Sequence, residues 1–460
     1  MEKKSHKNSD GNFFEKVVVP VYLFLLGSAI ITSIYFAISS NIKLNLKLKL
    51  IPNPNIFRRT SAILENCTVY KIIETKNELA LVGVTSAKDA FIAKIDLNAA
   101  RGGKIAFFCE YGGSDVDFFN DIIETEDGCL IASGYTSSLD NDLETAERYG
   151  ESDKGYNWVL KIDPNKNDVI FNKCYDMKNG IFKKMVESNG KLFFCTAPDN
   201  YTSVPPTPGI YREQIPSKGN IIGIDPSVEN EGGIFFNRVF GNDNEFYIFY
   251  DMLKARNGNL VLSGGYKSNQ VERNNVRHNY YGGEDGFIME FSPQTELVVF
   301  FQCYGGKKRD RLFSIRECRD GRFIAVGEQL SAKNLLKTWI LKIDLKRKNN
   351  YIFSKIYPDK IQLSKLPFAE DIAGNLNFPL TYQHVNKDST ILNENILEVI
   401  SINSGKGKLQ KNHIVLDSDF SSCDNILITK TKKSEIVVIA KIDKEFILFK
   451  LPRLEKMKYE

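Results

Sequence analysis

The sequence is poor in the residues and motifs on which most enzymatic chemistry depends. Its histidines are few and scattered, so they do not form the spacing of a zinc site; they are His6, His278, His384 and His413. The chain also lacks a phosphate-binding glycine loop, a nucleophile elbow and a metalloprotease helix. These absences argue against the common hydrolase, nucleotide-binding and zinc-dependent classes, and we expect the protein to need no cofactor.

The sequence also lacks an excess of one charge. The 61 Lys and Arg residues nearly balance the 57 Asp and Glu residues, which leaves a net charge of +4 spread without a basic face. Because proteins that bind nucleic acids concentrate basic residues on one surface, we expect no nucleic-acid partner. Aromatic residues make up 12% of the chain and are mostly Phe and Tyr, which is typical of a strand-rich protein.

The eight cysteines are even in number, as a disulfide framework would require, but their positions do not favour one. Cys129 and Cys195 fall in second strands of successive repeats, and Cys109, Cys174 and Cys303 fall in last strands. Whole sheets would therefore separate them, whereas a disulfide needs Cα atoms within roughly 7 Å. The sequence predicts mostly free, buried thiols that pack as small hydrophobic side chains.

Charged residues are absent from positions 17 to 42, and this run is long enough to cross a bilayer, which needs about 20 apolar residues. The sequence predicts a transmembrane helix at 17–40 (Val17–Ser40), after a polar tail at 1–16, with Pro20 in its first turn. A retained signal anchor fits this length. The small-x-small form of Ala37-Ile38-Ser39 leaves a cleaved signal as the alternative.

Basic residues flank the apolar run on both sides, so the positive-inside rule nearly cancels. A first helix that follows a short basic tail commonly places the following domain outside the cytoplasm. We therefore expect a single-pass membrane protein with an extracytoplasmic domain, joined to its helix by a linker at 41–54.

Positions 55–451 consist of repeats of one unit, which is clearest from Tyr111 to Tyr175. Short apolar runs separated by turn residues indicate four antiparallel strands in each unit. A Lys-Ile-Asp corner recurs at roughly 60-residue intervals, in intact or degraded form. The corners end at Asp96, Asp163, Asp225, Ser292, Asp344 and Asn403. Asn-Gly or Asp-Gly hairpin turns keep the same phase at Asp127, Asn189, Asn257 and Asp320.

Seven first strands follow from this phase, near Tyr70, Asp121, Phe182, Tyr250, Phe313, Phe368 and Ile426. The sequence thus predicts an all-β fold, a seven-bladed β-propeller of four-stranded antiparallel blades, preceded by one N-terminal transmembrane helix. The seventh unit lacks a fourth strand, because Pro452 and a polar tail at 452–460 follow its third. Asn55–Thr60 resembles the other fourth strands, so we expect it to complete the final blade and close the ring.

The repeat resembles that of the bacterial and archaeal seven-bladed β-propeller repeat proteins. The matching segments are Asp89–Asp96, Tyr111–Gly113, Asp127–Gly128 and Ser133–Ser138. The third, sixth and seventh units depart from the pattern, as do Gly223 and Glu290, which stand where Lys is usual. The resemblance implies a propeller that is exported or at the cell surface and that serves for binding or as an accessory module. It implies no catalytic residues.

Three long loops, Tyr135–Tyr156, Ala197–Gly219 and Tyr266–Glu284, each join a second strand to a third, so we expect them on one face. The first loop is acidic. Its candidate calcium ligands are Asp140, Asp142 and Glu144, although their spacing matches no EF-hand and a solvated loop is the alternative. The other two loops supply the aromatic and basic residues that are enriched in binding hot spots. The candidate binding residues are Tyr201, Tyr211, Arg212, Arg273, Arg277, His278, Tyr280 and Tyr281.

The sequence favours a membrane-anchored binding or scaffold module that recognises a protein or a glycan at the long-loop face. One alternative is a hydrolase that acts on polysaccharide through carboxylates in the channel, where Asp121 and Asp251 are expected. Another is a purely structural surface module.

Overall fold

The computed structural model divides the chain into two units, Met1–Pro54 and Asn55–Glu460. It describes residues 56–451 apart from gaps, of which those of five or more residues are 58–63, 97–103, 198–217, 269–281, 358–367, 386–390, 413–422 and 431–435. The predicted membrane segment at 17–40 lies outside the described residues. Among the residues that are described, no helix has the length and hydrophobicity needed to cross a membrane.

Strands dominate the described residues, and they form small sheets in chain order. Sheet 1 contains β2 (Cys67–Glu74), β3 (Glu78–Thr85), β4 (Ala90–Asp96) and β5 (Lys104–Tyr111). Sheet 2 contains β6 (Asp117–Glu124), β7 (Leu130–Thr136), β9 (Tyr156–Asp163), β10 (Asp168–Tyr175) and β8 (Glu147–Tyr149). Sheet 3 contains β11 (Ile181–Ser188), β12 (Lys191–Ala197), β13 (Gly219–Ile224) and β14 (Ile234–Phe240).

The remaining sheets follow the same order of strands. Sheet 4 contains β15 (Glu245–Lys254), β16 (Leu260–Ser268), β17 (Asp285–Ser292) and β18 (Leu297–Tyr304). Sheet 5 contains β19 (Asp310–Glu317), β20 (Phe323–Leu330), β21 (Leu336–Ile343) and β22 (Tyr351–Ile356). Sheet 6 contains β23 (Ala369–Glu370), β24 (Asn375–Val385), β25 (Ile391–Asn403) and β26 (Lys408–Asn412). Sheet 7 contains β27 (Cys423–Lys430), β28 (Ile436–Ile442), β29 (Glu445–Leu451) and β1 (Ile56–Phe57).

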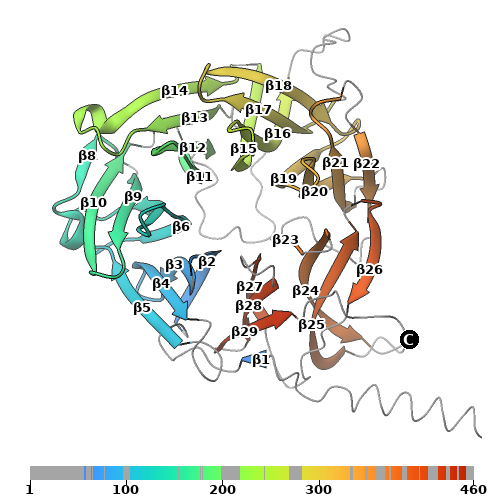
Figure 1. Cartoon of the computed structure of the whole chain (residues 1–460), viewed down its shortest axis with the longest axis horizontal. Coiled ribbons are helices and arrows are strands. Elements are labelled where there is room, and N and C mark those ends of the chain that lie inside the picture. Colours follow the sequence, from blue (N-terminus) through green and yellow to red (C-terminus); the bar gives the residue numbers. More distant parts are fainter. Residues whose placement is uncertain are drawn as a thin grey trace, which may run out of the picture. The chain divides into compact units, whose positions relative to one another are not determined.

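Within the second unit the sheets stand around a central opening, with the first strand of each sheet innermost (Figure 1). The fold is therefore an all-β propeller of small antiparallel sheets, as the repeats predict. Two short 3-10 helices, η3 (Asn141–Leu143) and η5 (Asn230–Gly233), lie in the described connections. Sheet 7 is closed by the start of the domain, because Ile56 of β1 pairs with Phe449 of β29. This confirms the prediction that residues near Ile56 complete the final sheet.

Sheet 2 corrects the prediction that every sheet has four strands. Its fifth strand, β8, pairs in parallel with β10, so that Arg148 lies opposite Cys174. The strand lies within the acidic loop between β7 and β9, whose Leu143 is fully buried in the core. Part of the loop that the sequence presents as a polar connection is thus a packed extension of the sheet.

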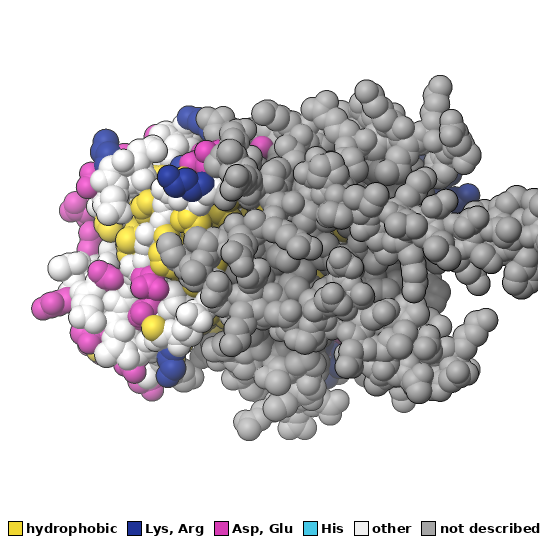
Figure 2. Space-filling view, turned by 90° about the horizontal axis from the view of Figure 1, so that it is seen from below, with side chains coloured by type: hydrophobic (Ala, Val, Ile, Leu, Met, Phe, Trp, Pro, Cys, Tyr) yellow, Lys and Arg dark blue, Asp and Glu magenta, His cyan; other side chains and the backbone are white. Residues whose placement is uncertain are grey.

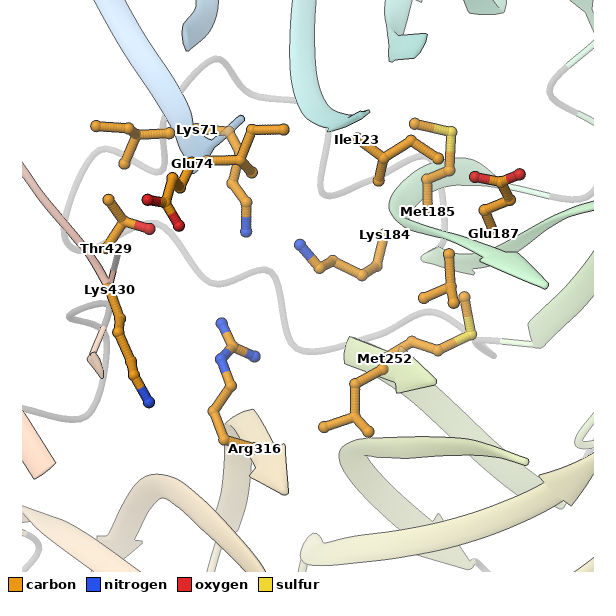
Figure 3. Close-up of a pocket in the computed structure, with 14 residues that line it drawn as sticks. Lys71, Glu74, Ile123, Lys184, Met185, Glu187, Met252, Arg316, Thr429 and Lys430 are labelled. Atoms are coloured by element: carbon orange, nitrogen blue, oxygen red, sulfur yellow. The ribbon is translucent and has the colours of Figure 1, made fainter. Parts of the chain in front are cut away.

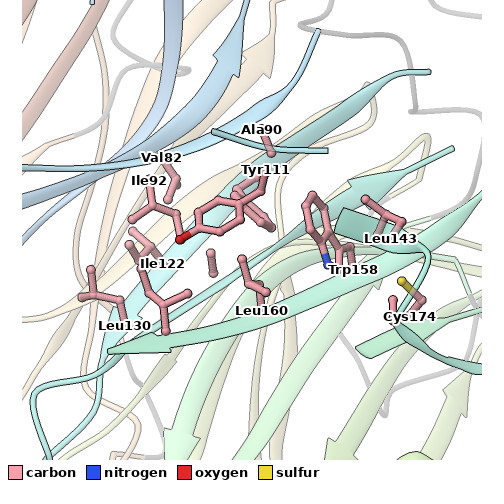
Figure 4. Packing of buried hydrophobic residues seen from close by; sticks show 14 of the residues in the cluster. Val82, Ala90, Ile92, Tyr111, Ile122, Leu130, Leu143, Trp158, Leu160 and Cys174 are labelled. Atoms are coloured by element: carbon pink, nitrogen blue, oxygen red, sulfur yellow. The ribbon is translucent and has the colours of Figure 1, made fainter. Parts of the chain in front are cut away.

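The hydrophobic core lies between neighbouring sheets, where large side chains of the third strands fill the space. Phe91, Trp158 and Phe287 are fully buried, and Trp339 is 2% exposed. Around Trp158, side chains of sheets 1 and 2 interlock (Figure 4). Seven cysteines of the described residues form no disulfide, and all but Cys109 are buried, as the sequence predicts.

The Lys-Ile-Asp corners have a structural role that explains their recurrence. The corner lysine of a third strand binds the acidic residue of the hairpin turn beside it: Lys161 Nζ lies 3.0 Å from Asp127, and Lys342 Nζ lies 2.8 Å from Asp320. In sheet 4 the donor and the acceptor exchange places. The third-strand residue Glu290 accepts a hydrogen bond of 2.8 Å from the side-chain amide of the turn residue Asn257. The departure from Lys at this corner therefore preserves the contact.

The glycines that follow the fourth-strand tyrosines are required by a close approach. A Cβ on Gly112 would lie 2.6 Å from Asp117 Oδ2 and 2.9 Å from Asp89 Oδ1. A Cβ on Gly305 would lie 2.6 Å from both Asp285 Oδ1 and Asp310 Oδ2. Only glycine leaves room for these carboxylates where one sheet passes to the next.

Candidate functional site

The innermost strands of sheets 1 to 5 share a β-bulge that aligns one side chain of each of these sheets. The pairing shifts between Val69 and Lys71 in β2, and the same shift recurs in β6, β11, β15 and β19. We call the first paired residue after this bulge the channel position. Its occupants in sheets 1 to 5 are Lys71, Asp121, Lys184, Asp251 and Ser314. Basic and acidic residues therefore alternate through the first four sheets.

The two aspartates at the channel position join their sheets to the next. Asp121 is 1% exposed; its Oδ2 accepts a hydrogen bond of 2.8 Å from the backbone N–H of Met185, and its Oδ1 accepts one of 3.0 Å from Lys184 Nζ. Each oxygen thus contacts sheet 3, which is the next sheet in the ring.

Asp251 makes the equivalent contacts to sheet 5. Its Oδ2 accepts hydrogen bonds from the backbone N–H of Ile315 at 3.0 Å, from Ser314 Oγ at 2.9 Å and from Arg316 Nη1 at 2.7 Å. Its Oδ1 accepts a bond of 3.0 Å from the N–H of Met252. Both carboxylates therefore accept hydrogen bonds from donors of the next sheet.

The basic residues of the inner strands point into a cavity of about 470 Å³ that six of the first strands line. Lys71 of β2, Lys184 of β11 and Arg316 of β19 extend toward one another across this space (Figure 3). Their side chains are 25%, 16% and 36% exposed, so each is partly buried by the surrounding strands. Lys430 of β27 lines the same cavity.

The three ionisable groups at the cavity respond differently to this setting. Burial and the nearby charge of Lys184 lower the pKa of Lys71 to about 7, although Asp121 acts in the opposite direction. For Lys184, burial acts to lower the pKa, but the charges of Asp121 and Asp251 outweigh it and the pKa is raised. For Asp251, burial is outweighed by Arg316 and Lys184, which lower the pKa. Lys71 is thus the cation whose charge the protein compensates least.

Glutamates near the ends of the first strands cap neighbouring turns. Glu124 accepts a hydrogen bond of 3.2 Å from the N–H of Lys76, and Glu317 accepts one of 2.8 Å from the N–H of Arg256. Each bond links a first strand to the hairpin turn of the preceding sheet. These carboxylates, like those at the channel position, hold adjacent sheets together.

The binding residues predicted from the sequence lie outside the described residues. They are Tyr201, Tyr211, Arg212, Arg273, Arg277, His278, Tyr280 and Tyr281. They belong to the long connections between β12 and β13 and between β16 and β17.

The acidic loop is described, and two of its carboxylates bond the backbone of the passage from sheet 1 to sheet 2. Asp140 Oδ1 accepts a hydrogen bond of 2.8 Å from the N–H of Ser114, and Asp142 Oδ2 accepts one of 3.1 Å from the N–H of Gly112. Among the described residues no group of three or more His, Cys, Asp or Glu is arranged to hold a metal ion. The candidate ligands Asp140, Asp142 and Glu144 therefore do not form such a group.

The described part of the surface that Figure 2 shows carries acidic and basic side chains next to one another, with hydrophobic side chains between them. No single charge dominates this view. The concentration of basic side chains at the cavity contrasts with that mixed surface.

The channel position carries a sequence signal that the analysis of repeats did not include. Each first strand from sheets 1 to 4 reads as a charged residue, two apolar residues and a second charged residue. The four segments are Lys71–Glu74, Asp121–Glu124, Lys184–Glu187 and Asp251–Lys254. Aligning these segments by their hairpin turns would have placed Lys71 and Lys184 at one level of the channel.

Comparisons with known proteins find distant similarity to solved structures. No protein-family model and no curated protein matches the chain. Among solved structures, an ulvan lyase bound to a -[GlcA(1-4)Rha3S]- ligand is 14% identical and covers 83% of this chain and 91% of its own, with a TM-score of 0.46. The Dos1 propeller is 10% identical over 84% of this chain and 93% of its own, with a TM-score of 0.44. Hydrazine synthase of Kuenenia stuttgartiensis is 9% identical over 66% and 75%, with a TM-score of 0.39. The likeness concerns the fold alone.

Proposed function

We propose that this chain is a binding or scaffold module: a closed propeller in which all seven sheets act as blades, held at a membrane by residues 17–40 and exposed outside the cytoplasm. The repeated strand order and the pairing of β1 with β29 support the closed ring. The absence of charge from 17 to 42 supports the anchor.

The observation that carries a binding function over catalysis is that the channel carboxylates are engaged in contacts between sheets. An acid–base pair for glycoside hydrolysis needs one carboxyl group that gives its proton to the leaving group and one that activates water or attacks the sugar. Asp121 and Asp251 instead accept hydrogen bonds from the next sheet through both of their oxygens or from several donors. A lowered pKa at Asp251 also opposes a role as a general acid.

The ligand that fits this proposal is a protein or a glycan docked at the long-loop face. The eight candidate residues in the second and third long loops include four tyrosines and three arginines. Tyrosine and arginine are enriched among the residues that contribute most to binding at protein interfaces. A rigid ring beneath them would keep the loops in place.

The first test is a glycan array, probed with the full-length chain in detergent. We expect a signal that is lost when Arg277, Tyr280 and Tyr281 are replaced together by Ala. Lys166→Ala serves as the control, because Lys166 is an exposed residue in a third-to-fourth strand turn. An unchanged signal in the triple variant would contradict the site. Release of reducing ends from a bound glycan would favour the hydrolase over the binding module.

The second test addresses the membrane. Protease added to intact cells should remove the propeller while the Met1 end is still detected, as an anchored external domain requires. Protection until the cells are broken would contradict the proposed orientation, and a mature N-terminus near Ser39 would show a cleaved signal.

A further inference from the structure

Three basic side chains from three different sheets meet at the central cavity. Lys71, Lys184 and Arg316 come from sheets 1, 3 and 5, and Figure 3 shows their charged ends directed into the same space. Repulsion between such groups is unfavourable unless anions lie nearby. The described anions that contact them are Asp121 and Asp251.

The two aspartates contact the three cations unequally. Asp121 lies 3.0 Å from Lys184 Nζ but 3.9 Å from Lys71 Nζ, and Asp251 lies 2.7 Å from Arg316 Nη1. Glu74, Glu187 and Lys430 also line the cavity, so the lining carries both signs of charge, and Lys71 is the cation with the longest contact to an aspartate. Asp121 and Asp251 are fixed by backbone N–H groups of the next sheets, so they cannot move closer to it.

We propose that the cavity binds a small oxyanion, a phosphate, sulfate or carboxylate group, through Lys71, Lys184 and Arg316. The inference rests on the proposed binding function and deepens it, because it assigns the chemistry of a ligand and a second place on the ring that contacts one. The lining residues lie at the ends of their first strands, beside the hairpin turns, so the oxyanion is either free or carried by a larger ligand that approaches from that end of the channel.

The donors at the cavity suit an oxyanion. Arg316 bonds both Asp251 and the carbonyl of Ile315 through Nη1, and a guanidinium has further N–H donors on Nη2 and Nε. Its guanidinium also lies 5.6 Å from the centre of the Phe368 ring, which helps to fix its plane. Two lysine ammonium groups add rotatable donors opposite this fork. Charge-assisted bonds to oxygen from both residue types are stronger than neutral ones.

Binding of an oxyanion should be linked to protonation of Lys71. Lys71 has a pKa of about 7, so near neutral pH part of the population carries a neutral amine. The charged groups that face it are Glu74 of its own strand, Asp121 of β6, Lys184 and Glu187 of β11, Arg316 of β19 and Lys430 of β27. An added anion favours the ammonium form, so binding takes up a proton and weakens as the pH rises through 7.

The test is calorimetric titration of sulfate, which stays fully ionised, into the full-length chain in detergent at pH 6 and pH 8.5. We expect affinity to fall by roughly tenfold or more between these pH values. Lys71→Met should weaken binding at pH 6 and remove the pH dependence. Lys71→Arg should bind equally at both pH values, because an arginine does not lose its proton. Lys254→Met, an exposed change of the same charge on β15, should behave as the unaltered chain does.

Three results would overturn the proposal: no binding at millimolar sulfate, equal binding in the Lys71→Met and unaltered chains, or a loss of binding in Lys254→Met as large as in Lys71→Met. Comparison with a sulfated disaccharide separates a free anion from a carried one. A carried group predicts tighter binding of the disaccharide than of sulfate, and Lys71→Met should weaken the binding of both. If sulfate binds at the cavity while no glycan or protein binds at the loops, the proposed loop site fails and the cavity site stands.

Discussion

Sheet 2 contacts sheet 3 in the same way as sheet 4 contacts sheet 5, but the two contacts use different cations. In both, an aspartate at the channel position accepts the backbone N–H of the second residue after the next bulge. Asp121 is balanced by Lys184, which is itself at a channel position, whereas Asp251 is balanced by Arg316, two residues beyond Ser314. The carboxylate is thus fixed by the fold, while the cation is supplied by whichever side chain reaches it.

The contact between sheets 1 and 2 differs from both of these, because a lysine occupies the channel position of sheet 1. At the channel position of sheet 1, Lys71 Nζ lies 3.9 Å from Asp121 of the following sheet. At the same position of sheet 3, Lys184 Nζ lies 3.0 Å from Asp121 of the preceding sheet. Carboxylates at this position hold the ring together, and amines at the same position are directed toward the cavity. Along this level of the channel, residues that join neighbouring sheets therefore alternate with residues that face the proposed anion site.

The largest effect is expected at Asp251. Replacement by Ala removes the acceptor of Arg316, Ser314 and the N–H of Ile315, and it leaves a partly buried cation without its partner. We expect a loss of about 3–5 kcal/mol in the free energy of unfolding, measured by urea denaturation. Asp168→Ala, at an exposed position of β10, is the control. A loss below about 1 kcal/mol at Asp251 would show that the passage does not depend on this carboxylate.

A smaller effect is expected from the coupling between Asp121 and Lys184. A double-mutant cycle with Asp121→Asn and Lys184→Met should give a coupling energy of about 1–3 kcal/mol, because the pair is mostly buried and also bonds the backbone. Unfolding of the four proteins by urea provides the measurement. A coupling energy near zero would mean that Asp121 is held by the N–H of Met185 alone.

Asp310 should make the protein less stable as the pH rises, whereas Asp251 should make it more stable. Burial raises its pKa to about 6 from a reference of 3.8, despite hydrogen bonds such as that from the N–H of Gly306. The stability that it contributes is present below about pH 4 and is lost as the pH rises through 6. The Tm of Asp310→Asn should therefore rise relative to the unaltered chain by about 2 °C between pH 4 and pH 7.

Asp251→Asn is the matched comparison for Asp310→Asn. The pKa of Asp251 is lowered in the folded protein, so its contribution to stability increases with pH instead of decreasing. Its Tm should fall relative to the unaltered chain as the pH rises from 3 to 7. A constant difference in Tm across this range for both variants would contradict the account of how burial and cations act on these carboxylates.

The smallest effect is expected at the corners. Lys161→Met removes a contact to Asp127, whose side chain is 56% exposed, and should cost less than about 1 kcal/mol. Lys342→Met removes the same contact from a lysine that is only 1% exposed, and should cost more. Equal losses in thermal unfolding would show that burial of the lysine does not matter at this corner.

Much of the fold follows from local patterns in the sequence. Hairpin turns such as Asp127-Gly128 and Asn189-Gly190 locate the strands on either side, because positive φ favours glycine there. The corners keep the phase, and Asn403 indeed ends β25 with its side chain accepting the N–H of Gly405, as expected of such a corner. The closing role of Ile56 follows because only a fourth strand was missing from the last unit.

The features that the sequence analysis missed depend on contacts between distant residues. β8 lacks an alternating pattern of its own, and it forms a strand because it can pair with the edge of β10. The cavity was missed because the bulge shifts the side-chain alternation by one residue, so Lys71 and Lys184 cannot be assigned to the channel from a period of two. Whether their charges converge depends on how the sheets close into a ring.

Oxyanion binding at the cavity is tested most directly by the titration of Lys71 itself. The titration is monitored by NMR of isotope-labelled lysine side chains, and the signal is assigned with Lys71→Arg. We expect the Lys71 titration to have a midpoint near pH 7 that rises when sulfate is added, because the bound anion stabilises the ammonium form. A midpoint near the ordinary lysine value of 10.5, unchanged by sulfate, would contradict this expectation.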